Sequence, residues 1–491
     1  MRRRLNNVAM AVSFAVVFSV CGRALYAAAT TTQSDSGAST MTQLTAGAAR
    51  VVITATTGNW DWKEVHDDLF ARALALRSGD TTIVLVNVDL GSISKEVADR
   101  AKQLAQELTQ IPAENILIAA THTHFAPFVG RATEGPAKAY QEWLPARIAD
   151  AIWLAQSRLR PARVAHGSGA VPGEVFNRRY WMKDGKVWFN PPDVRYRDAD
   201  GNYINVWQSS DIVRPAGPID PEVGVLVVMG DDWKPIAVVA NYALHYVGGP
   251  HYEKISADYF GYFERALQRM AGAEFVGIMF NGTCGDVNNE DYMGTREADG
   301  TYRKDYELGS FYQVERVSNV VAAEVFRVWQ GWRRSQYRSE VPLGVANDWF
   351  RFQFRRVTSE EVTQAREMLA KPEADSFGDV QWLERVHAGA VVDCAERGPE
   401  RITQIQAFRI GDLGIVTLPG EIFVEYGLQI KKASPFAQTL VCELANDSLG
   451  YVPTDRAMTE GSYEVLNSRA APGTEGAMVS TATTLLRQLA R

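Results

Sequence analysis

Short, uninterrupted apolar runs constrain the fold of this chain more than any other feature of its sequence. The runs IVLVNVD (83–89) and ILIAA (116–120) are rich in β-branched residues and show no regular polar alternation. Runs of this kind are typical of strands that are buried on both faces. We therefore predict strands at both places and at five further strand-like runs: 223–229, 235–242, 276–280, 405–410 and 414–418.

Helical spacing of apolar residues lies between several of these runs. Residues 95–108 show it between the first two strands, which predicts a strand–helix–strand unit. The mixture predicts an α/β fold with mixed β-sheets and flanking helices, in one large domain from residue 45 to residue 491. Because this length exceeds the usual size of a single core, we expect two tightly packed lobes that share one site. Four further helices are predicted: 136–157, 259–271, 312–329 and 359–371.

The first 29 residues have the three-part layout of a secretory signal peptide. Arginines follow Met1, an apolar run spans 8–20, and three alanines stand at 27–29. The run is shorter than the roughly 20 residues of a membrane-spanning helix, so we predict a cleaved signal and an exported protein, either periplasmic or secreted. Cys21 leaves a lipoprotein signal as the alternative. Residues 30–44 are rich in Thr, Ser, Ala and Gly and are predicted to form a disordered linker.

Charge and cysteine content narrow the classes of partner and scaffold. The formal net charge is −7, and removal of the signal, which holds four arginines and no acid, makes the remainder more acidic. This balance argues against a nucleic-acid partner, because phosphate binding needs clustered Lys and Arg. Cys284, Cys394 and Cys442 remain after processing. In an oxidising compartment they permit one disulfide and leave one free thiol, which is too little for a cysteine-stapled scaffold.

Two of the seven histidines lie in Thr121-His122-Thr123-His124, directly after the predicted strand 116–120. Two residues apart in extended backbone, their imidazoles face the same way, which suits a metal ion. The carboxyl ends of strands in open α/β sheets are also where sites form. The alternative is a His-Thr-His turn held by hydrogen bonds.

Two further metal-ligand candidates follow predicted strands. His245 ends the run 236–242 and precedes two glycines, and Glu421 follows the run 414–418. A carboxylate is a plausible ligand beside nitrogen donors. For His245 the alternative is an ordinary hydrogen-bonding role. For Glu421 it is an acid at the N-terminus of a helix, and Glu425, one turn on, competes for any role given to Glu421.

These motifs together resemble the neutral/alkaline, non-lysosomal ceramidase family over most of residues 45–480. Each motif is weak alone, but their order and spacing are specific. The resemblance implies a ceramidase-like α/β catalytic domain without the C-terminal β-sandwich that animal and bacterial members carry. The matching segments are AATHTHFAP (119–127), VFNRR (175–179), PIDPEVGVL (218–226), NYALH (241–245), ISADYFGY (255–262), NGTCGDVN (281–288), LPGEIF (418–423) and NDSLGYVPTDRAMTEGSYE (446–464).

The resemblance implies a single zinc ion and names its ligands. In that family the first histidine of THTH, the histidine of NYALH, the glutamate of PGE and a downstream tyrosine bind the metal. Carried over, these residues are His122, His245, Glu421 and Tyr451.

The resemblance also implies roles beside the metal. The second THTH histidine, His124, faces the substrate, the tyrosine matching Tyr463 helps to hold the oxyanion, and Arg178 reaches the active site. We interpret Asp286 as orienting a ligand histidine, with a turn aspartate as the equal alternative. The other histidines, His66, His166, His251 and His387, receive no zinc role, although His251 is near enough to His245 to line the pocket.

With these residues, the resemblance implies hydrolysis of an amide. Zinc with two histidines and a carboxylate lowers the pKa of a bound water to about 7 and so supplies hydroxide at neutral pH. Glu421 could help to move a proton. We expect His124, with an ordinary pKa near 6.5, to protonate the departing amine. Tyr463 and the zinc would share the oxyanion, an effect worth roughly 3 kcal/mol per donor.

The predicted function is zinc-dependent hydrolysis of an N-acyl bond, with ceramide or a related N-acyl lipid as the leading substrate and peripheral contact with membrane lipid as its consequence. Two alternatives remain: a zinc hydrolase of a non-lipid amide or ester, and a non-catalytic exported binding protein of the same fold. A serine hydrolase of the nucleophile-elbow type is excluded because no G-x-S-x-G occurs. Residues 181–210 resemble a loop insertion near Arg178 that sets substrate choice. The sequence does not fix the oligomeric state.

Overall fold

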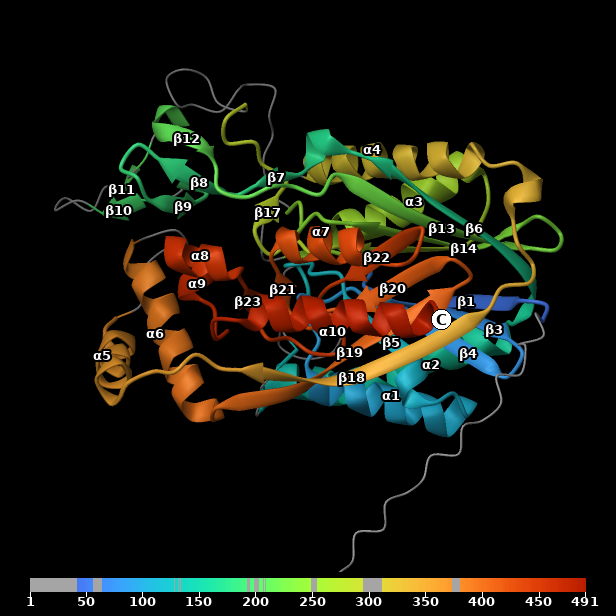
Figure 1. Cartoon of the computed structure of the whole chain (residues 1–491), viewed down its shortest axis with the longest axis horizontal. Coiled ribbons are helices and arrows are strands. Elements are labelled where there is room, and N and C mark those ends of the chain that lie inside the picture. Colours follow the sequence, from blue (N-terminus) through green and yellow to red (C-terminus); the bar gives the residue numbers. More distant parts are fainter. Residues whose placement is uncertain are drawn as a thin grey trace, which may run out of the picture. The chain divides into compact units, whose positions relative to one another are not determined.

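An eight-stranded mixed sheet and a four-stranded mixed sheet carry the fold in the computed structural model of the protein (Figure 1). Residues 41–491 cluster as one compact unit. The structure describes residues 42–55, 64–127, 129, 130, 132, 134–191, 195–197, 203–205, 207, 209–248, 254–294, 311–372 and 380–491.

The eight-stranded sheet consists of two halves that meet at a narrow junction. At this junction β6 and β1 are joined by only two residue pairs, Thr45 with Pro161 and Ala46 with Arg160. Strands β4 and β5 are parallel, as are β14 and β16, and the other pairs are antiparallel. In order across the sheet the strands are β16 (Val276–Asn281), β14 (Pro235–Tyr242), β13 (Glu222–Gly230), β6 (Arg160–Ala170), β1 (Thr45–Val52), β3 (Phe70–Ser78), β4 (Thr81–Val88) and β5 (Ile116–Ala120).

The two halves face each other across a shared apolar core. Strand β16, at one edge, contacts β3 and β4 of the other half. The core joins Leu226 and Val228 of β13 to Leu74 and Leu76 of β3. This folding brings β5 and β14, which belong to different halves, to the same region of the molecule.

The four-stranded sheet completes this core. Phe408 of β19 and Leu440 of β22 pack into it. Its strands are β18 (Leu343–Gln353), β19 (Glu400–Ile410), β20 (Leu413–Thr417) and β22 (Gln438–Cys442).

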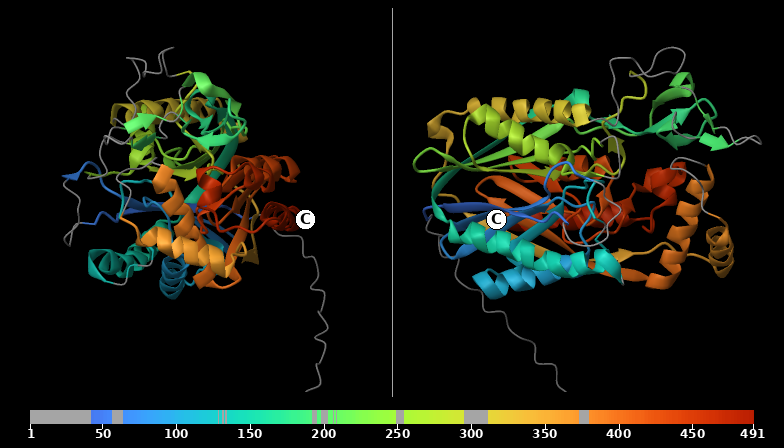
Figure 2. Two further views of the ribbon diagram at one scale, coloured as in Figure 1. Left: turned by 90° about the vertical axis from the view of Figure 1, so that its left-hand side faces the viewer. Right: turned by 180° about the vertical axis from the view of Figure 1, so that it is seen from behind.

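Helices cover the outer faces of the sheets, as Figures 1 and 2 show. Helices α1 (Lys95–Thr109) and α2 (Gly135–Ser157) cover the β1–β5 half, and α3 (Asp258–Ala271) and α4 (Phe311–Gln330) cover the other half. Helices α7 (Val424–Ala433) and α10 (Thr474–Leu489) pack on the four-stranded sheet. The remaining helices are α5 (Ser359–Ala370), α6 (Val380–Arg397), α8 (Asp455–Glu460) and α9 (Tyr463–Leu466).

Short strand pairs connect the loops beside the sheets. The pair that matters for the site joins β21 (Glu421–Ile422) to β23 (Tyr451–Val452) in parallel. The others are β7 (Phe176–Asn177) with β17 (Val287–Asn288), β2 (Glu64–Val65) with β15 (Lys254–Ile255), β10 (Arg195–Arg197) with β11 (Tyr203–Asn205), and the set β12 (Ile212–Pro215), β8 (Arg179–Met182) and β9 (Val187–Phe189).

The predicted α/β architecture with mixed sheets and flanking helices is confirmed. The predicted signal peptide and residues 30–41 of the predicted linker lie outside the described residues. Leu44, assigned to the linker, is fully buried and its amide bonds to the Ser339 carbonyl, so packed structure begins earlier than predicted. Among the described helices none is both long and apolar enough to cross a membrane. The disulfide that the sequence permits is not formed, because Cys284, Cys394 and Cys442 are buried free thiols.

Candidate metal centre

The candidate site lies where strands of both sheets end. His122 follows β5 and His245 follows β14, in the two halves of the large sheet, while Glu421 follows β20 of the small sheet. The predicted convergence of these three residues is present, and the folded-over sheet is its cause.

His122 and His245 point their outer ring nitrogens at each other. The two Nε2 atoms lie 2.9 Å apart. Each inner nitrogen contacts a backbone carbonyl oxygen. Nδ1 of His122 contacts the carbonyl of Gly91, and Nδ1 of His245 contacts the carbonyl of Cys284 at 2.9 Å. Because a carbonyl only accepts, both Nδ1 atoms carry the proton. Both Nε2 lone pairs then face one point, the orientation that a metal ion requires.

The backbone at the THTH motif differs from the predicted extended form. His122 has a φ of 68°, in the left-handed region, directly after β5 ends at Ala120. The two imidazoles nevertheless converge, with their Nε2 atoms 3.3 Å apart. A turn, not strand alternation, therefore brings them together. A non-glycine residue held in this conformation stores strain, which is common at functional sites.

Glu421 supplies a carboxylate to the same point. Its Oε2 lies 3.4 Å from Nε2 of His122 and 3.7 Å from Nε2 of His245. This oxygen is buried and has no hydrogen-bond partner among the described residues. Burial raises the pKa of Glu421, but the neighbouring His122, Tyr451 and Arg178 outweigh it and hold the pKa below its ordinary value. The carboxylate is thus charged, and its Oε2 atom has no hydrogen-bond partner among the described residues.

Glu421 belongs to β21 and is not a helix N-cap acid, since α7 begins at Val424. The competing residue Glu425 is bound elsewhere: its carboxylate forms an ion pair with Arg456 at 3.0 Å. Within the described structure the geometry favours Glu421.

Tyr451 lies between Glu421 and a buried arginine. Its hydroxyl hydrogen-bonds to the Glu421 carboxylate and accepts a bond from Nη2 of Arg178 at 3.1 Å. Arg178 also donates to Glu464 at 2.8 Å and to the Gly285 carbonyl at 2.8 Å. Burial, followed by the negative charge of Glu421, raises the pKa of Tyr451. Arg178 therefore reaches the site by holding the tyrosine.

Tyr463 lies beside Tyr451, with the ring centroids 5.4 Å apart in an edge-on arrangement. The two hydroxyls share a hydrogen bond. Burial, and after it the charge of Glu421, raises the pKa of Tyr463 to about 12. The hydroxyl is therefore a protonated donor at neutral pH.

His124 lies at the edge of the cluster, stacked on Tyr246 with centroids 3.8 Å apart. Burial lowers the pKa of His124 to about 3, with a smaller contribution from His122. The sequence-based expectation of an ordinary pKa is wrong for this environment, and the resting imidazole is neutral. The ligand atoms of His122, His124 and His245 lie within 4.8 Å of one another, so His124 also stands at metal-ligand distance.

Asp286 is near the site but contacts neither ligand histidine. Its Oδ1 accepts from the Val424 amide at 2.8 Å and its Oδ2 from Asn177 at 2.8 Å. It therefore joins the segment before Arg178 to the start of α7. The orienting contact that was assigned to Asp286 is made instead by the Cys284 carbonyl to His245.

Glu443 is a part of the site that the motifs did not reveal. It is fully buried after β22 and accepts from the amides of Ile422 at 2.8 Å and Cys284 at 3.1 Å. Burial raises the pKa of Glu443 well above its ordinary value. Its position directly after an apolar strand, like that of Glu421, was the signal that could have identified it. Glu464, which pairs with Arg178, lay inside a quoted motif but was not assigned a role.

The other histidines are engaged elsewhere. His66 stacks on Phe311, His166 contacts Gln438 and Asp412, and His387 contacts Leu466. His251, suggested for the pocket, lies outside the described residues, as does part of the predicted insertion 181–210.

The donor set fits a zinc ion. Two imidazole Nε2 atoms and a buried carboxylate oxygen without a hydrogen-bond partner lie within 3.7 Å of one another, and a tyrosine hydroxyl binds the same carboxylate. Nitrogen and carboxylate donors of this kind are those of catalytic zinc sites.

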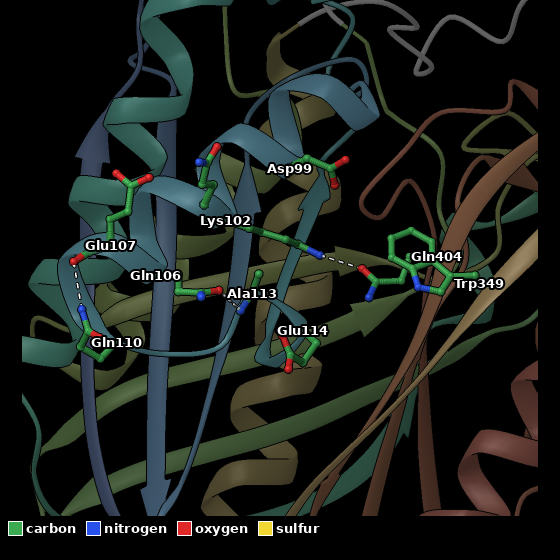
Figure 3. Close-up of a pocket in the computed structure, with 10 residues that line it drawn as sticks. Asp99, Lys102, Gln106, Glu107, Gln110, Ala113, Glu114, Trp349 and Gln404 are labelled. Atoms are coloured by element: carbon green, nitrogen blue, oxygen red, sulfur yellow. Dashed lines mark hydrogen bonds between the residues drawn. The ribbon is translucent and has the colours of Figure 1, made fainter. Parts of the chain in front are cut away.

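A cavity that is separate from this centre lies elsewhere in the fold. It has a volume of about 640 Å³ and lies between α1 and strands β18 and β19 (Figure 3). Lys102 extends across it to Gln404, at an Nζ to Oε1 distance of 3.1 Å. None of the residues of the candidate metal centre lines this cavity.

Comparisons with known proteins address the fold. No protein-family model matches the chain, and no curated protein sequence matches it. The crystal structure of neutral ceramidase from Pseudomonas aeruginosa superposes with a TM-score of 0.66, at 19% identity, over 91% of this chain and 74% of that one. A ceramidase complexed with C2 superposes with a TM-score of 0.65, at 16% identity, over 91% of this chain and 75% of that one.

The chain has the ceramidase fold. At these identities the likeness concerns the fold, so the roles of the site residues rest on their own geometry. The ceramidase fold of this chain includes the strand ends that carry His122, His245 and Glu421.

Proposed function

We propose that this protein is an exported zinc-dependent hydrolase of N-acyl amide bonds, with N-acylsphingosine or a related N-acyl lipid as the leading substrate. One observation carries the proposal: the unprotonated Nε2 atoms of His122 and His245 converge with a buried Glu421 oxygen that has no hydrogen-bond partner. The fold shared with two ceramidase structures supports the substrate class.

Zinc in this donor set would supply an acidified water as nucleophile at neutral pH. His122, His245 and Glu421 would hold it, with Tyr451 as the fourth ligand. Arg178 donates a hydrogen bond to the Tyr451 hydroxyl and is itself held in place by its bond to Glu464.

His124 is the group that moves the proton. Because burial keeps its imidazole neutral, it accepts the proton that the attacking water loses. The same imidazole then donates this proton to the nitrogen of the departing amine, so that water and amide become a carboxylic acid and an amine. Its place beside Nε2 of His122 suits both transfers.

Tyr463 stabilises the charge that develops on the carbonyl oxygen. Its raised pKa keeps the hydroxyl protonated, and a positioned donor of this kind is worth about 3 kcal/mol in the transition state. Arg178 and Tyr451 limit the movement of Tyr463 through the shared hydrogen bond and ring contact.

A hydrolysis screen with matched variants tests the proposal. The purified protein is assayed on N-palmitoylsphingosine, short soluble N-acyl amides and acetate esters, before chelation, after chelation and after zinc is restored. Glu421→Gln is compared with Glu425→Gln, a change in the first turn of α7 at a surface ion pair. We expect cleavage of the N-acyl lipid that is lost on chelation, regained with zinc and absent in Glu421→Gln alone.

Other results would change the assignment. Cleavage of only the soluble amides or esters keeps the metal chemistry and replaces the substrate. Full activity after thorough chelation contradicts the mechanism, and a metal-free protein that cleaves none of the substrates favours the non-catalytic binding role.

A further inference from the structure

A second cavity lies beside the candidate centre and has a mainly apolar lining. Its volume is about 330 Å³, and it is a half-open pocket lined by residues of β9, α6 and α9. Apolar side chains from three separate segments form most of its walls: Val187, Trp188, Phe189, Leu383 and Leu466. Lys186, Glu384, His387 and Glu460 also line it. No continuous hydrophobic insertion is needed to build such a pocket, which is why the sequence did not reveal it.

Tyr463 is common to this cavity and the candidate centre. It lines the cavity, and its ring lies 4.6 Å from that of Phe189. The Tyr463 ring also packs edge-on against Tyr451, and Tyr451 hydrogen-bonds to Glu421. A group bound to the Tyr463 hydroxyl therefore lies at the boundary between the metal centre and the cavity.

Two hydrogen-bonding atoms of the cavity wall lack partners. Oγ of Ser462 and Nε1 of Trp188 are buried, and neither has a hydrogen-bond partner among the described residues. Ser462 also has a φ of 83°, a left-handed conformation that is strained for a side chain other than glycine. Unpaired buried polar atoms are costly, so a ligand with an apolar body and a polar end suits this cavity.

We infer that this cavity is the subsite for the aliphatic acyl chain of the substrate, with Trp188, Phe189 and Leu383 as its walls. The inference rests on the proposed function, in which Tyr463 binds the carbonyl oxygen. The chain that continues from that carbonyl is the acyl chain. His124, proposed to face the departing amine, contacts Tyr246 and does not line this cavity.

Binding of a fatty acid locates the chain without any turnover. A brominated fatty acid quenches nearby tryptophans, so saturable quenching is measured in the wild type, Trp188→Phe and Trp349→Phe. Trp349 lines the other cavity and serves as the matched control. We expect the saturable component to fall in Trp188→Phe, with the neighbouring Trp207 and Trp382 supplying what remains, and to be unchanged in Trp349→Phe. Equal quenching in all three proteins overturns the inference.

Chain-length preference gives a second test through Leu383→Trp, which fills the cavity from α6. The ratio of kcat/KM for N-palmitoyl over N-acetyl sphingosine is compared with the surface control Leu108→Phe. We expect the ratio to fall by about tenfold or more in Leu383→Trp, because each buried methylene contributes about 0.8 kcal/mol. Zinc content and the melting curve report on folding.

The two proposals fail in different ways. Localised quenching in a protein that cleaves no amide supports the chain-binding cavity and removes the proposed function. Amide cleavage with the same chain-length ratio in the wild type and a folded Leu383→Trp overturns the cavity assignment and leaves the hydrolase. If Leu383→Trp does not fold, the quenching experiment decides.

Discussion

Glu421 and Tyr451 lie opposite each other in a parallel pair of two-residue strands. The pairing places a carboxylate and a phenol hydroxyl from distant segments side by side, facing the imidazoles of His122 and His245. Backbone hydrogen bonds thus set the spacing of these two side chains, including the bond from the Glu421 amide to the Gly450 carbonyl.

Tyr451→Phe removes the hydroxyl that connects Arg178 to Glu421. We expect kcat/KM for the N-acyl substrate to fall by about 10²–10³, the loss typical of one positioned active-site group. Tyr140→Phe is the control, because its buried hydroxyl donates to the Ile53 carbonyl at 2.7 Å away from the centre. Steady-state kinetics at fixed zinc measures the effect. A rate within twofold of wild type would remove Tyr451 from the site.

Gly285→Ala tests the close packing behind Glu421. A Cβ at Gly285 would lie 2.5 Å from the Glu421 carbonyl oxygen, a backbone atom that cannot turn aside. We expect a loss of about 1–3 kcal/mol in unfolding free energy and weaker zinc binding. Gly389→Ala, on α6 in open space, is the control and gains about 0.5–1 kcal/mol. Denaturant titration of both variants gives the comparison, and an unchanged Gly285→Ala protein refutes the packing.

Arg178→Ala removes the arginine of a buried ion pair and leaves the Glu464 carboxylate without that partner. Arg178 is 6% exposed and Glu464 is fully buried. Removal of one member of a buried ion pair costs about 3–5 kcal/mol, so we expect a loss of that size in urea denaturation. Arg327→Ala, at an exposed helical pair, changes stability by less than about 0.5 kcal/mol. Equal losses of unfolding free energy in the two variants would show that the buried Arg178–Glu464 pair does not stabilise the protein.

Lys102 gives the protein a pH-dependent stability. Burial lowers the pKa of Lys102 to about 7 from an ordinary 10.5. Between these pH values the unfolded chain binds a proton at Lys102 that the folded chain does not. The unfolding free energy of the wild type therefore falls as the pH falls from about 10 to about 7. Below about pH 7 this lysine no longer changes it. Relative to wild type, Lys102→Met should therefore gain a few kcal/mol from about pH 10 to pH 7.

Chemical denaturation of Lys102→Met and wild type at the two pH values measures this difference. The control is Lys138→Met, whose half-exposed amine forms a surface pair with Glu142. A wild-type-to-variant difference that is the same at pH 7 and pH 10 would show that Lys102 is protonated in the folded protein.

The sequence predicted the buried strands that have continuous runs of β-branched residues. The bounds of β5 and β14 match the predicted runs, because continuous β-branched residues are needed where helices and a second sheet cover both faces. Strands β1 and β3 were missed. They are rich in alanine because α2 approaches closely: a Cβ at Gly47 would lie 2.2 Å from the Ala155 carbonyl oxygen. Small residues fit there but lack the pattern of a strand.

Strand β18 was missed for the opposite reason. Much of it is exposed, as at Trp349, so it shows no apolar run. The metal candidates His122, His245 and Glu421 were found because each follows an apolar strand. The choice between Glu421 and Glu425 required the structure, since only the β21–β23 pairing separates the two carboxylates.

Zinc stoichiometry tests the central claim most directly. Elemental analysis after zinc loading and desalting is made on the wild type, His245→Ala and Glu421→Gln, with His166→Ala as the control at a surface contact with Asp412. We predict about one zinc per chain in the wild type and in His166→Ala. We predict little zinc in His245→Ala and Glu421→Gln, because each lacks one of the few side chains that would hold the ion. A wild-type protein that retains no zinc, or equal zinc in all four proteins, would contradict the assignment of this centre.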